Sequence, residues 1–210
     1  MKALESLKWR ASVRKFDTDL KVSNKDLETL LEAGNLAATS GGLQPFKIVV
    51  VSNDELKKQL VPMSYNQEHV GTASHVLVFS IETKIGHNTV DAYIDRAAEV
   101  KNLERSDLEG YQNSMYGYMD GMDENQKLVW ARNQAYISLG TVMTIAADLK
   151  IDSCAMEGFD PLKFQEALDL KSKNLMPVVI LPIGYRSKEE VMASAPKVRK
   201  TTENFVLEIN

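Results

Sequence analysis

The segment from residue 123 to 149 most constrains how this chain can fold, because its second half is apolar on nearly every side. It reads as one long helix from Asp123 or Glu124 to about Leu149, and from Ala135 onward few polar residues interrupt it. A helix that is apolar all round must be buried all round. It can lie at the centre of a monomer or against a second subunit. We favour the second subunit and expect a homodimer.

Short apolar runs at 46–51, 75–81 and 177–185 are typical of buried strands, and 151–156 reads as another short strand. Further helices are expected near 3–8, after Ser23, and at 54–60, 90–104, 107–119 and 161–170, with Ser106 opening the fifth. No repeat or Pro/Gly/Ser linker divides the chain. We therefore predict one α+β or mixed α/β domain over residues 1–210, with a sheet of four or five strands. The last stretch, 199–210, is expected to add a strand or to form an arm on a partner.

The composition excludes several classes of protein. A net charge of -4 and a pI near 5.5 provide no general attraction for nucleic acid or anionic membranes. The first twelve residues lack the apolar core of a signal peptide, and no run approaches the roughly 18 apolar residues that span a bilayer. We expect a soluble, cytoplasmic protein. The single cysteine, Cys154, excludes an internal disulfide and reads as a small buried hydrophobe.

Common catalytic and nucleotide-binding motifs do not occur in the sequence. It contains no GxGxxG after a strand, no GxxxxGK[ST], no HExxH and no GxSxG. His69, His75 and His87 lack metal-ligand spacing, so no metal is expected, and His75 opens a buried strand as a core residue would. No side chain stands out as a catalytic acid or base.

Basic residues gather near both ends of the chain. In an extended segment Arg10, Ser12 and Arg14 share one face, which suits a phosphate because arginine donates forked, charge-assisted hydrogen bonds. Lys197 and Arg199 repeat the i, i+2 spacing near the other end. Read singly, each group is equally well explained as a solvated basic face.

Three other segments carry polar, glycine or aromatic residues that suit a ligand. They are Glu157-Gly158-Phe159 after the short strand, the loop from Thr39 to Gln44, and the Tyr- and Met-rich stretch 111–122 that contains Tyr116. Glycines in the first two let backbone amides approach a ligand closely. An ordinary turn and plain packing are the alternative explanations.

The order of these motifs resembles the FMN-dependent nitroreductase family over nearly the whole chain. The resemblance rests on R-x-S-x-R-x-F at 10–16, the loop ending in Q-P-F at 40–46, T-A-S-H at 72–75 with Phe79, E-G-F at 157–159 and P-K-x-R at 196–199. It implies a nitroreductase-like α+β fold with a central mixed sheet flanked by helices. It further implies an intertwined homodimer with FMN at the subunit interface.

The resemblance also implies a role for each site residue. Arg10, Ser12, Lys197 and Arg199 would hold the FMN phosphate and ribityl end. Arg14 would approach the pyrimidine edge of the flavin, and the backbone amides of Glu157 and Gly158 would face N5 and O4. The other positions implied at the cofactor are Thr39, Ser40, Gly41 and Gly42 from the second subunit, together with Asn66, His69 and Gln134. Tyr116 and Phe159 would lie on the substrate side.

The expected function is an FMN-dependent oxidoreductase that passes a hydride from NAD(P)H to a flat electron acceptor. Nitroaromatics, quinones or flavins would be reduced by a ping-pong mechanism, with no catalytic side chain. An alternative is a non-catalytic FMN-binding storage or sensor module, because Gly42 and His69 stand where the family often has asparagine and, in some relatives, lysine. A third hypothesis is a structural dimer whose basic residues are merely surface.

Overall fold

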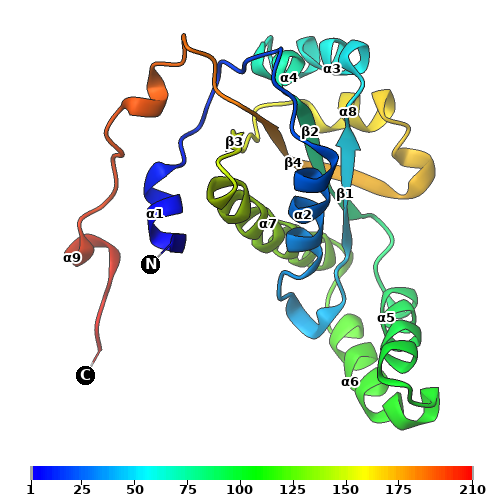
Figure 1. Cartoon of the computed structure of the whole chain (residues 1–210). Coiled ribbons are helices and arrows are strands. Elements are labelled where there is room, and N and C mark those ends of the chain that lie inside the picture. The colour runs from blue at the N-terminus through cyan, green and yellow to red at the C-terminus, as the bar shows by residue number, and fades with distance from the viewer. Residues whose placement is uncertain (1, 210) are drawn as a thin grey trace.

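A four-stranded sheet forms the centre of the computed structural model, which describes residues 2–209 (Figure 1). The strands are β1 (Phe46–Val51), β2 (His75–Glu82), β3 (Asp152–Ser153) and β4 (Leu175–Gly184), in the order β1-β2-β4-β3. The α+β class and a sheet of four strands agree with the prediction. The expected mixed sheet is corrected: every strand pair is antiparallel, and parallel pairing is confined, in residues 2–209, to the isolated bridge between Ser12 and Ser153.

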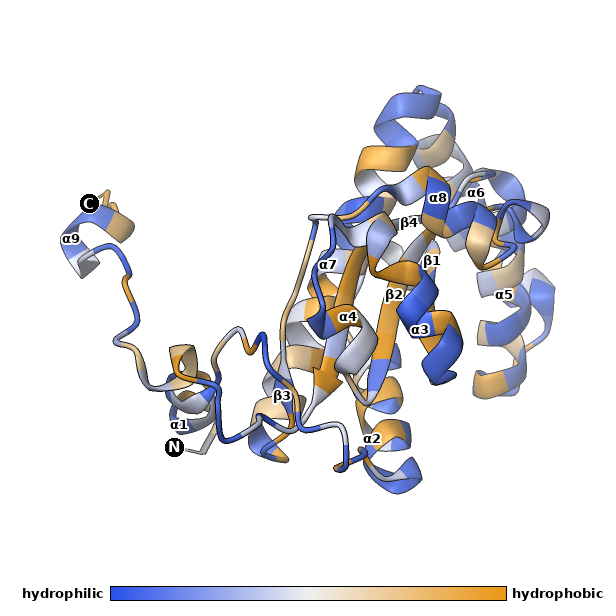
Figure 2. Cartoon of the chain, turned by 90° about the horizontal axis from the view of Figure 1, so that it is seen from above, coloured by the Kyte–Doolittle hydropathy of each residue, from blue (hydrophilic) through white to orange (hydrophobic). Residues whose placement is uncertain are grey.

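Helices cover both faces of the sheet. They are α1 (Lys2–Trp9), α2 (Asn24–Asn35), α3 (Asp54–Leu60), α4 (His69–Thr72), α5 (His87–Lys101), α6 (Glu109–Asp120), α7 (Glu124–Asp148), α8 (Pro161–Ala167) and α9 (Thr202–Phe205). Leu77 and Phe79 of β2 pack into one core with α2 and α7, whereas Val76 and Val78 pack into a second core with α3 and α8. Figure 2 shows the apolar residues concentrated on the strands between these layers. Burial on both faces explains why the strands read as continuous apolar runs.

Side-chain caps fix where several helices begin. Ser23 accepts the N–H of Asp26 at 3.1 Å, as predicted. Asp123 likewise accepts the N–H of Gln126 at 2.8 Å and caps α7, which begins at Glu124, one of the two starts expected. The predicted start at Ser106 was wrong. Asp107 instead reaches back to the N–H of Glu104 at 3.1 Å, which closes a 3-10 turn over Arg105–Leu108, and α6 begins only at Glu109.

The long helix α7 is buried on one side only within this chain. It packs on α2 and on strands β1, β2 and β4. On its other side Ile137 is 45% exposed, and a side-chain carbon at Gly140 would meet nothing within 4 Å. Helix α1 also packs on α7, so the chain satisfies only part of the burial that the apolar sequence of α7 predicts and leaves the surface around Ile137 and Gly140 available for packing.

The C-terminal residues form an arm that leaves the body of the molecule. Beyond β4 the chain runs past α1 to the short helix α9 (Figures 1 and 2). Phe205, Leu207 and Ile209 are each at least 79% exposed. Of the two structures expected for this segment, an added strand does not form among residues 199–209, which the structure describes.

No helix in the described part of the chain combines the length and apolarity needed to cross a membrane.

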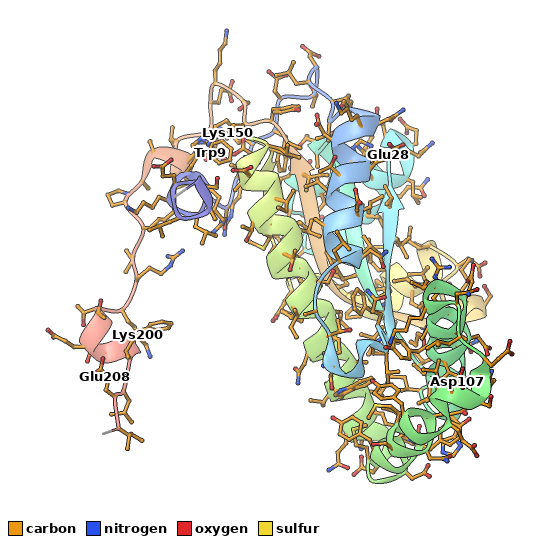
Figure 3. The ribbon with its side chains drawn as sticks, turned by 60° about the horizontal axis from the view of Figure 1, so that its bottom comes forward. Trp9, Glu28, Asp107, Lys150, Lys200 and Glu208 are labelled. Atoms are coloured by element: carbon orange, nitrogen blue, oxygen red, sulfur yellow. The ribbon has the colours of Figure 1, made fainter. Side chains whose placement is uncertain are left out.

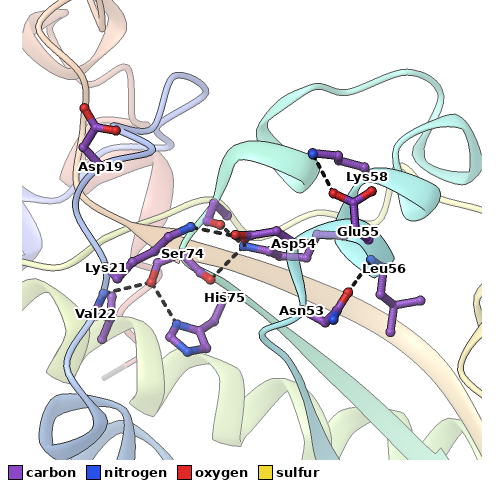
Figure 4. A network of polar contacts seen from close by, with 12 residues as sticks. Asp19, Lys21, Val22, Asn53, Asp54, Glu55, Leu56, Lys58, Ser74 and His75 are labelled. Atoms are coloured by element: carbon purple, nitrogen blue, oxygen red, sulfur yellow. Dashed lines mark hydrogen bonds and ion pairs between the residues drawn. The ribbon is translucent and has the colours of Figure 1, made fainter.

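A buried lysine joins α3 to the segment that enters β2. The ammonium of Lys57 is fully buried, donates to the carbonyl of Ser74 at 2.9 Å and to that of Ala73, and pairs with Asp54 at 2.8 Å. Ser74 in turn accepts the N–H of Val22 at 2.8 Å (Figure 4). These contacts fix the end of α4 and therefore the position of the residues on it.

Replacing Lys57 tests the role of this contact. Lys57→Met leaves two buried carbonyls without their donor, which we expect to lower the free energy of unfolding by about 2 kcal/mol in urea denaturation. The matched control is Lys58→Met, because Lys58 is exposed and pairs with the exposed Glu55. Equal stability of the two variants would show that the buried ammonium does not hold α4.

Candidate functional site

Basic residues from the two ends of the chain meet in the structure. Arg10 donates from Nη2 to the hydroxyl of Ser12 at 3.2 Å, and Lys197 Nζ donates to the carbonyl of Lys8 at 2.5 Å. Arg199 lies close enough that its charge lowers the pKa of Arg10. We call Arg10, Ser12, Lys197 and Arg199 the terminal cluster. The four residues implied at the phosphate therefore gather in one chain.

The terminal cluster lacks an internal counter-charge. Burial first, and then the charge of Arg199, lower the pKa of Arg10 below its usual value. Across residues 2–209 neither Arg10, Lys197 nor Arg199 forms a salt bridge, and Arg10 Nε is buried without a hydrogen-bond partner. Arg10 is half-buried, and a buried cation normally has a charged partner, whereas Lys197 and Arg199 are exposed. The arrangement is suited to an external anion such as a phosphate.

Glu190 holds the two chain ends against each other. Its Oε2 accepts the backbone N–H groups of Arg14 and Lys15 at 2.7 and 2.9 Å, and its Oε1 accepts that of Met192 at 2.7 Å. Burial raises the pKa of Glu190, but these backbone donors outweigh it and leave the pKa below 4.5. The ionised carboxylate therefore fixes the segments that lead to both halves of the terminal cluster.

Arg14 lies beside His69 and Cys154, and the charge of Arg10 also reaches Cys154. His69 is buried and its Nε2 lies 3.0 Å from the sulfur of Met156. Burial and the charge of Arg14 lower the pKa of His69 from 6.5, so its ring is neutral near pH 7. Burial also raises the pKa of Cys154, which is buried as predicted and unsuited to act as a thiolate.

The turn at Glu157 and Gly158 directly follows Met156 and is held from two sides. Tyr136 on α7 donates its hydroxyl to the carboxylate of Glu157, and Gln67 donates to the carbonyl of Gly158 at 2.8 Å. Burial, and then the hydrogen bond to Glu157, raise the pKa of Tyr136 to about 12. These contacts fix the two peptide groups that the resemblance places against the flavin ring.

The second set of predicted residues forms a loop cluster, which consists of Thr39–Gly42, Tyr111, Tyr116 and Gln134. Gln134 is buried and accepts the N–H of Ser40 at 2.8 Å, while Tyr111 donates to the carbonyl of Gly41 at 2.8 Å. Gly41 and Gly42 have φ values of 60° and 68°, which favour glycine. Thr39 Oγ1 is buried without a partner, so this loop also has an unused polar group.

Tyr116 takes part in a network that includes charged residues. Its hydroxyl donates to Asp91 at 2.5 Å, and its ring stacks on His87 at 3.9 Å between centroids. Asp91 is also paired with Arg105 at 2.7 Å. Tyr116 is thus held in place on α6, in the same part of the molecule as the Ser40 loop.

Phe159 and Asn66 are the remaining two predicted site residues. Phe159 was expected on the substrate side, but it is 3% exposed and packs on Phe164 with centroids 4.8 Å apart. Its side chain belongs to the core because the Gly158 turn directs it inward. Asn66 is exposed, with a left-handed φ of 59° beside Gln67.

Within one chain, the terminal cluster and the loop cluster lie apart. The terminal cluster adjoins the segment between α1 and α2, and the loop cluster adjoins the segment between α2 and β1 (Figure 1). These segments emerge from opposite ends of α2, a helix of 12 residues and therefore about 18 Å long. Within the described residues, the terminal cluster and the loop cluster therefore lie at opposite ends of α2.

Three residues whose hydrogen bonds fix the segments of the site were not identified from the sequence. Glu190, Tyr136 and Gln67 each act on a segment distant in the chain, with separations of up to 176 residues. Local spacing carries no signal for such contacts.

Fold and site together define an α+β protein in which basic residues from both chain ends gather. The model of the nitroreductase family matches residues 7–185, and the chain therefore belongs to this family. The major NAD(P)H-flavin oxidoreductase of Aliivibrio fischeri is 32% identical over 210 residues, covering 97% of this chain and 96% of that protein. A Staphylococcus haemolyticus protein whose name provisionally assigns it to the NAD(P)H nitroreductases is 32% identical over 214 residues, with 97% and 95% coverage.

Solved structures show the same fold. A protein of Exiguobacterium sibiricum, described as a provisional nitroreductase in complex with FMN, superposes with a TM-score of 0.84 at 23% identity. The match covers 98% of this chain and 96% of that one. The predicted nitroreductase-like fold is confirmed.

The pH dependence of stability tests the role of Glu190. Its pKa is lowered in the folded protein, so its contribution is complete above 4.5 and is lost as the pH falls through the folded-state pKa. We expect Glu190→Gln to be less stable than the parent at pH 7, with the difference shrinking below pH 4.5. Thermal unfolding across pH measures this. A difference that stays constant with pH would contradict the role of the ionised carboxylate.

Proposed function

We propose that this chain is an FMN-dependent oxidoreductase that takes electrons from NAD(P)H. The observation that carries the proposal is the terminal cluster, in which Arg10 and Arg199 lie together without an internal anion and Arg10 Nε has no partner. Membership of the nitroreductase family and the name of the Aliivibrio fischeri relative support a flavin as the source of that anion.

The residues present fit FMN from its phosphate to its ring. Arg10, Lys197 and Arg199 neutralise the phosphate, and Ser12 offers it a hydroxyl. At the ring end Arg14 supplies positive charge, while the turn at 157–158 supplies backbone amides that Tyr136 and Gln67 hold in place. Bound FMN supplies two-electron transfer between NAD(P)H and an acceptor, and the protein supplies position and charge.

Arg14 and His69 set the electrostatics at the ring end. Arg14 is positive, whereas His69 is neutral near pH 7 because burial and Arg14 lower its pKa. A fixed positive charge stabilises the anionic form that a reduced flavin takes, which favours two-electron transfer. Arg14 therefore has a role distinct from that of the terminal cluster.

We propose that the working unit is an intertwined homodimer with FMN between the subunits. The loop cluster lies at the far end of α2 from the terminal cluster, and Thr39 Oγ1 in it is buried without a partner. The exposed face of α7 and the apolar arm at Phe205, Leu207 and Ile209 offer the surface that a second copy needs. A solution mass of one chain, 23.5 kDa, at micromolar concentration would contradict the dimer.

The proposed acceptors are flat, electron-poor molecules: nitroaromatics, quinones and flavins. Donor and acceptor occupy the same site over the flavin ring in turn, which gives ping-pong kinetics. Tyr116, held by Asp91 and His87, borders this site from the partner subunit's loop cluster. No side chain in the site is assigned as an acid or base.

The visible spectrum of the purified protein tests the function. We expect a flavin band that NADH or NADPH bleaches without oxygen and that a nitroarene or quinone restores. The variants Arg10→Ala and Arg199→Ala are expected to weaken FMN retention at least tenfold each, since each removes a charge-assisted contact with a charged group. Lys25→Gln, an exposed charge change on α2, serves as the control.

Two outcomes would contradict the proposal in different ways. Protein that is colourless and cannot be reconstituted with FMN would exclude a flavoprotein. Protein that keeps FMN but is bleached by neither nicotinamide would instead support the storage or sensor module.

A further inference from the structure

Two cations lie over the ring of Trp9, the last residue of α1. Lys150 Nζ is 4.7 Å and Arg186 Cζ is 4.6 Å from the ring centroid. Figure 3 shows Trp9 and Lys150 side by side where α1 meets the end of α7. Cations attract the face of an aromatic ring, and tryptophan does so most strongly. Trp9 is therefore held from two elements of the fold that are distant in sequence.

Arg186 is itself fixed by Asp152. The Nε of Arg186 lies 3.0 Å from both carboxylate oxygens of Asp152, and its Nη2 lies 2.5 Å from Oδ1. Its backbone N–H also donates to Asp152 at 2.8 Å. The carboxylate of Asp152 is buried and the side chain of Arg186 is 29% exposed, and the forked hydrogen bonds between them fix the orientation of the guanidinium.

Lys150 has a backbone conformation that is unusual for lysine. Lys150 follows α7 with a left-handed φ of 59°, where helices commonly place glycine or asparagine. Glycine would relieve this backbone strain. The lysine side chain therefore has a use at this position other than ending the helix, and its contact with Trp9 provides one.

We call the contacts of Trp9 with Lys150 and Arg186 the clamp. The clamp also fixes the position of Arg10, which is the next residue in the chain. Its N–H donates to the carbonyl of Ser6 at 2.9 Å, which extends the α1 hydrogen-bond pattern through Trp9. Two residues later Ser12 forms a bridge with Ser153, the neighbour of Asp152. The segment that carries Arg10 is thus held on both sides, which keeps the guanidinium near Arg199 despite their repulsion.

We propose that Trp9, clamped by Lys150 and Arg186, is a positioning residue that aims Arg10 at the phosphate of the cofactor. This inference rests on the proposed function, because it assigns the terminal cluster to the FMN phosphate. Its consequence is selective: loss of the clamp weakens recognition of the phosphate and leaves recognition of the flavin ring intact.

The test compares the affinities of the apoprotein for FMN and for riboflavin, which lacks the phosphate. Trp9→Leu removes the ring, and we expect FMN to bind about fivefold more weakly while riboflavin changes less than about twofold. Trp9→Phe keeps an aromatic face and is expected to restore FMN affinity to within about twofold of the parent. Fluorescence quenching of the flavin reports both affinities.

A second variant removes one cation with little risk to folding. Lys150→Gly relieves the left-handed backbone and deletes the contact with Trp9, so FMN binding is expected to weaken about twofold without a change for riboflavin. In the double variant of Trp9→Leu with Arg10→Ala, FMN binds no more weakly than with Arg10→Ala alone, because the clamp acts through Arg10. Lys25→Gln again controls for the loss of charge.

Equal losses of FMN and riboflavin affinity in Trp9→Leu would overturn the inference, because a general structural defect affects both ligands. Multiplicative losses in the double variant would also overturn it. If the parent protein binds neither flavin, the proposed function fails as well. The parent therefore separates failure of the function from failure of the positioning role.

Discussion

The candidate site requires that two guanidinium groups stay close to each other although they repel. Arg10 and Arg199 come from opposite ends of the chain, and the repulsion between them lowers the pKa of Arg10. Glu190 opposes the separation by binding backbone N–H groups of both the Arg14 segment and the segment that leads to Arg199. The fold thus maintains an unfavourable arrangement of charge, which an external anion would relieve.

The sheet and α7 provide the rigid frame for this arrangement. The antiparallel sheet, which is buried on both faces, fixes the positions of β3 and β4. Strand β3 carries Ser153, and β4 ends just before Arg186. On α7, Tyr136 faces the turn at Glu157 while Gln134 faces the Ser40 loop. One helix therefore supports both the Glu157 turn and the loop cluster. We propose a second subunit because the terminal cluster and the loop cluster lie at opposite ends of α2.

Much of the fold could be predicted from the sequence because local rules determine it. Caps at Ser23, Asp123 and Asp160 and the apolar strand runs gave element bounds close to those in the structure. The strand directions, the start of α6 and the inward direction of Phe159 depend on contacts across the fold, and no local pattern encodes them. For the site, the residue types were visible, but Glu190 and the Trp9 clamp act across more than 130 residues and could not be inferred.

The central claim is that both ends of one chain bind the phosphate while a second chain completes the site around the ring. A crystal structure of the protein with FMN tests this most directly. We expect phosphate oxygens within hydrogen-bond distance of Arg10 and Arg199 of one chain, and the ring bordered by the Ser40 loop of the partner subunit. A phosphate bound away from these arginines, or a complete site within one chain, would contradict it.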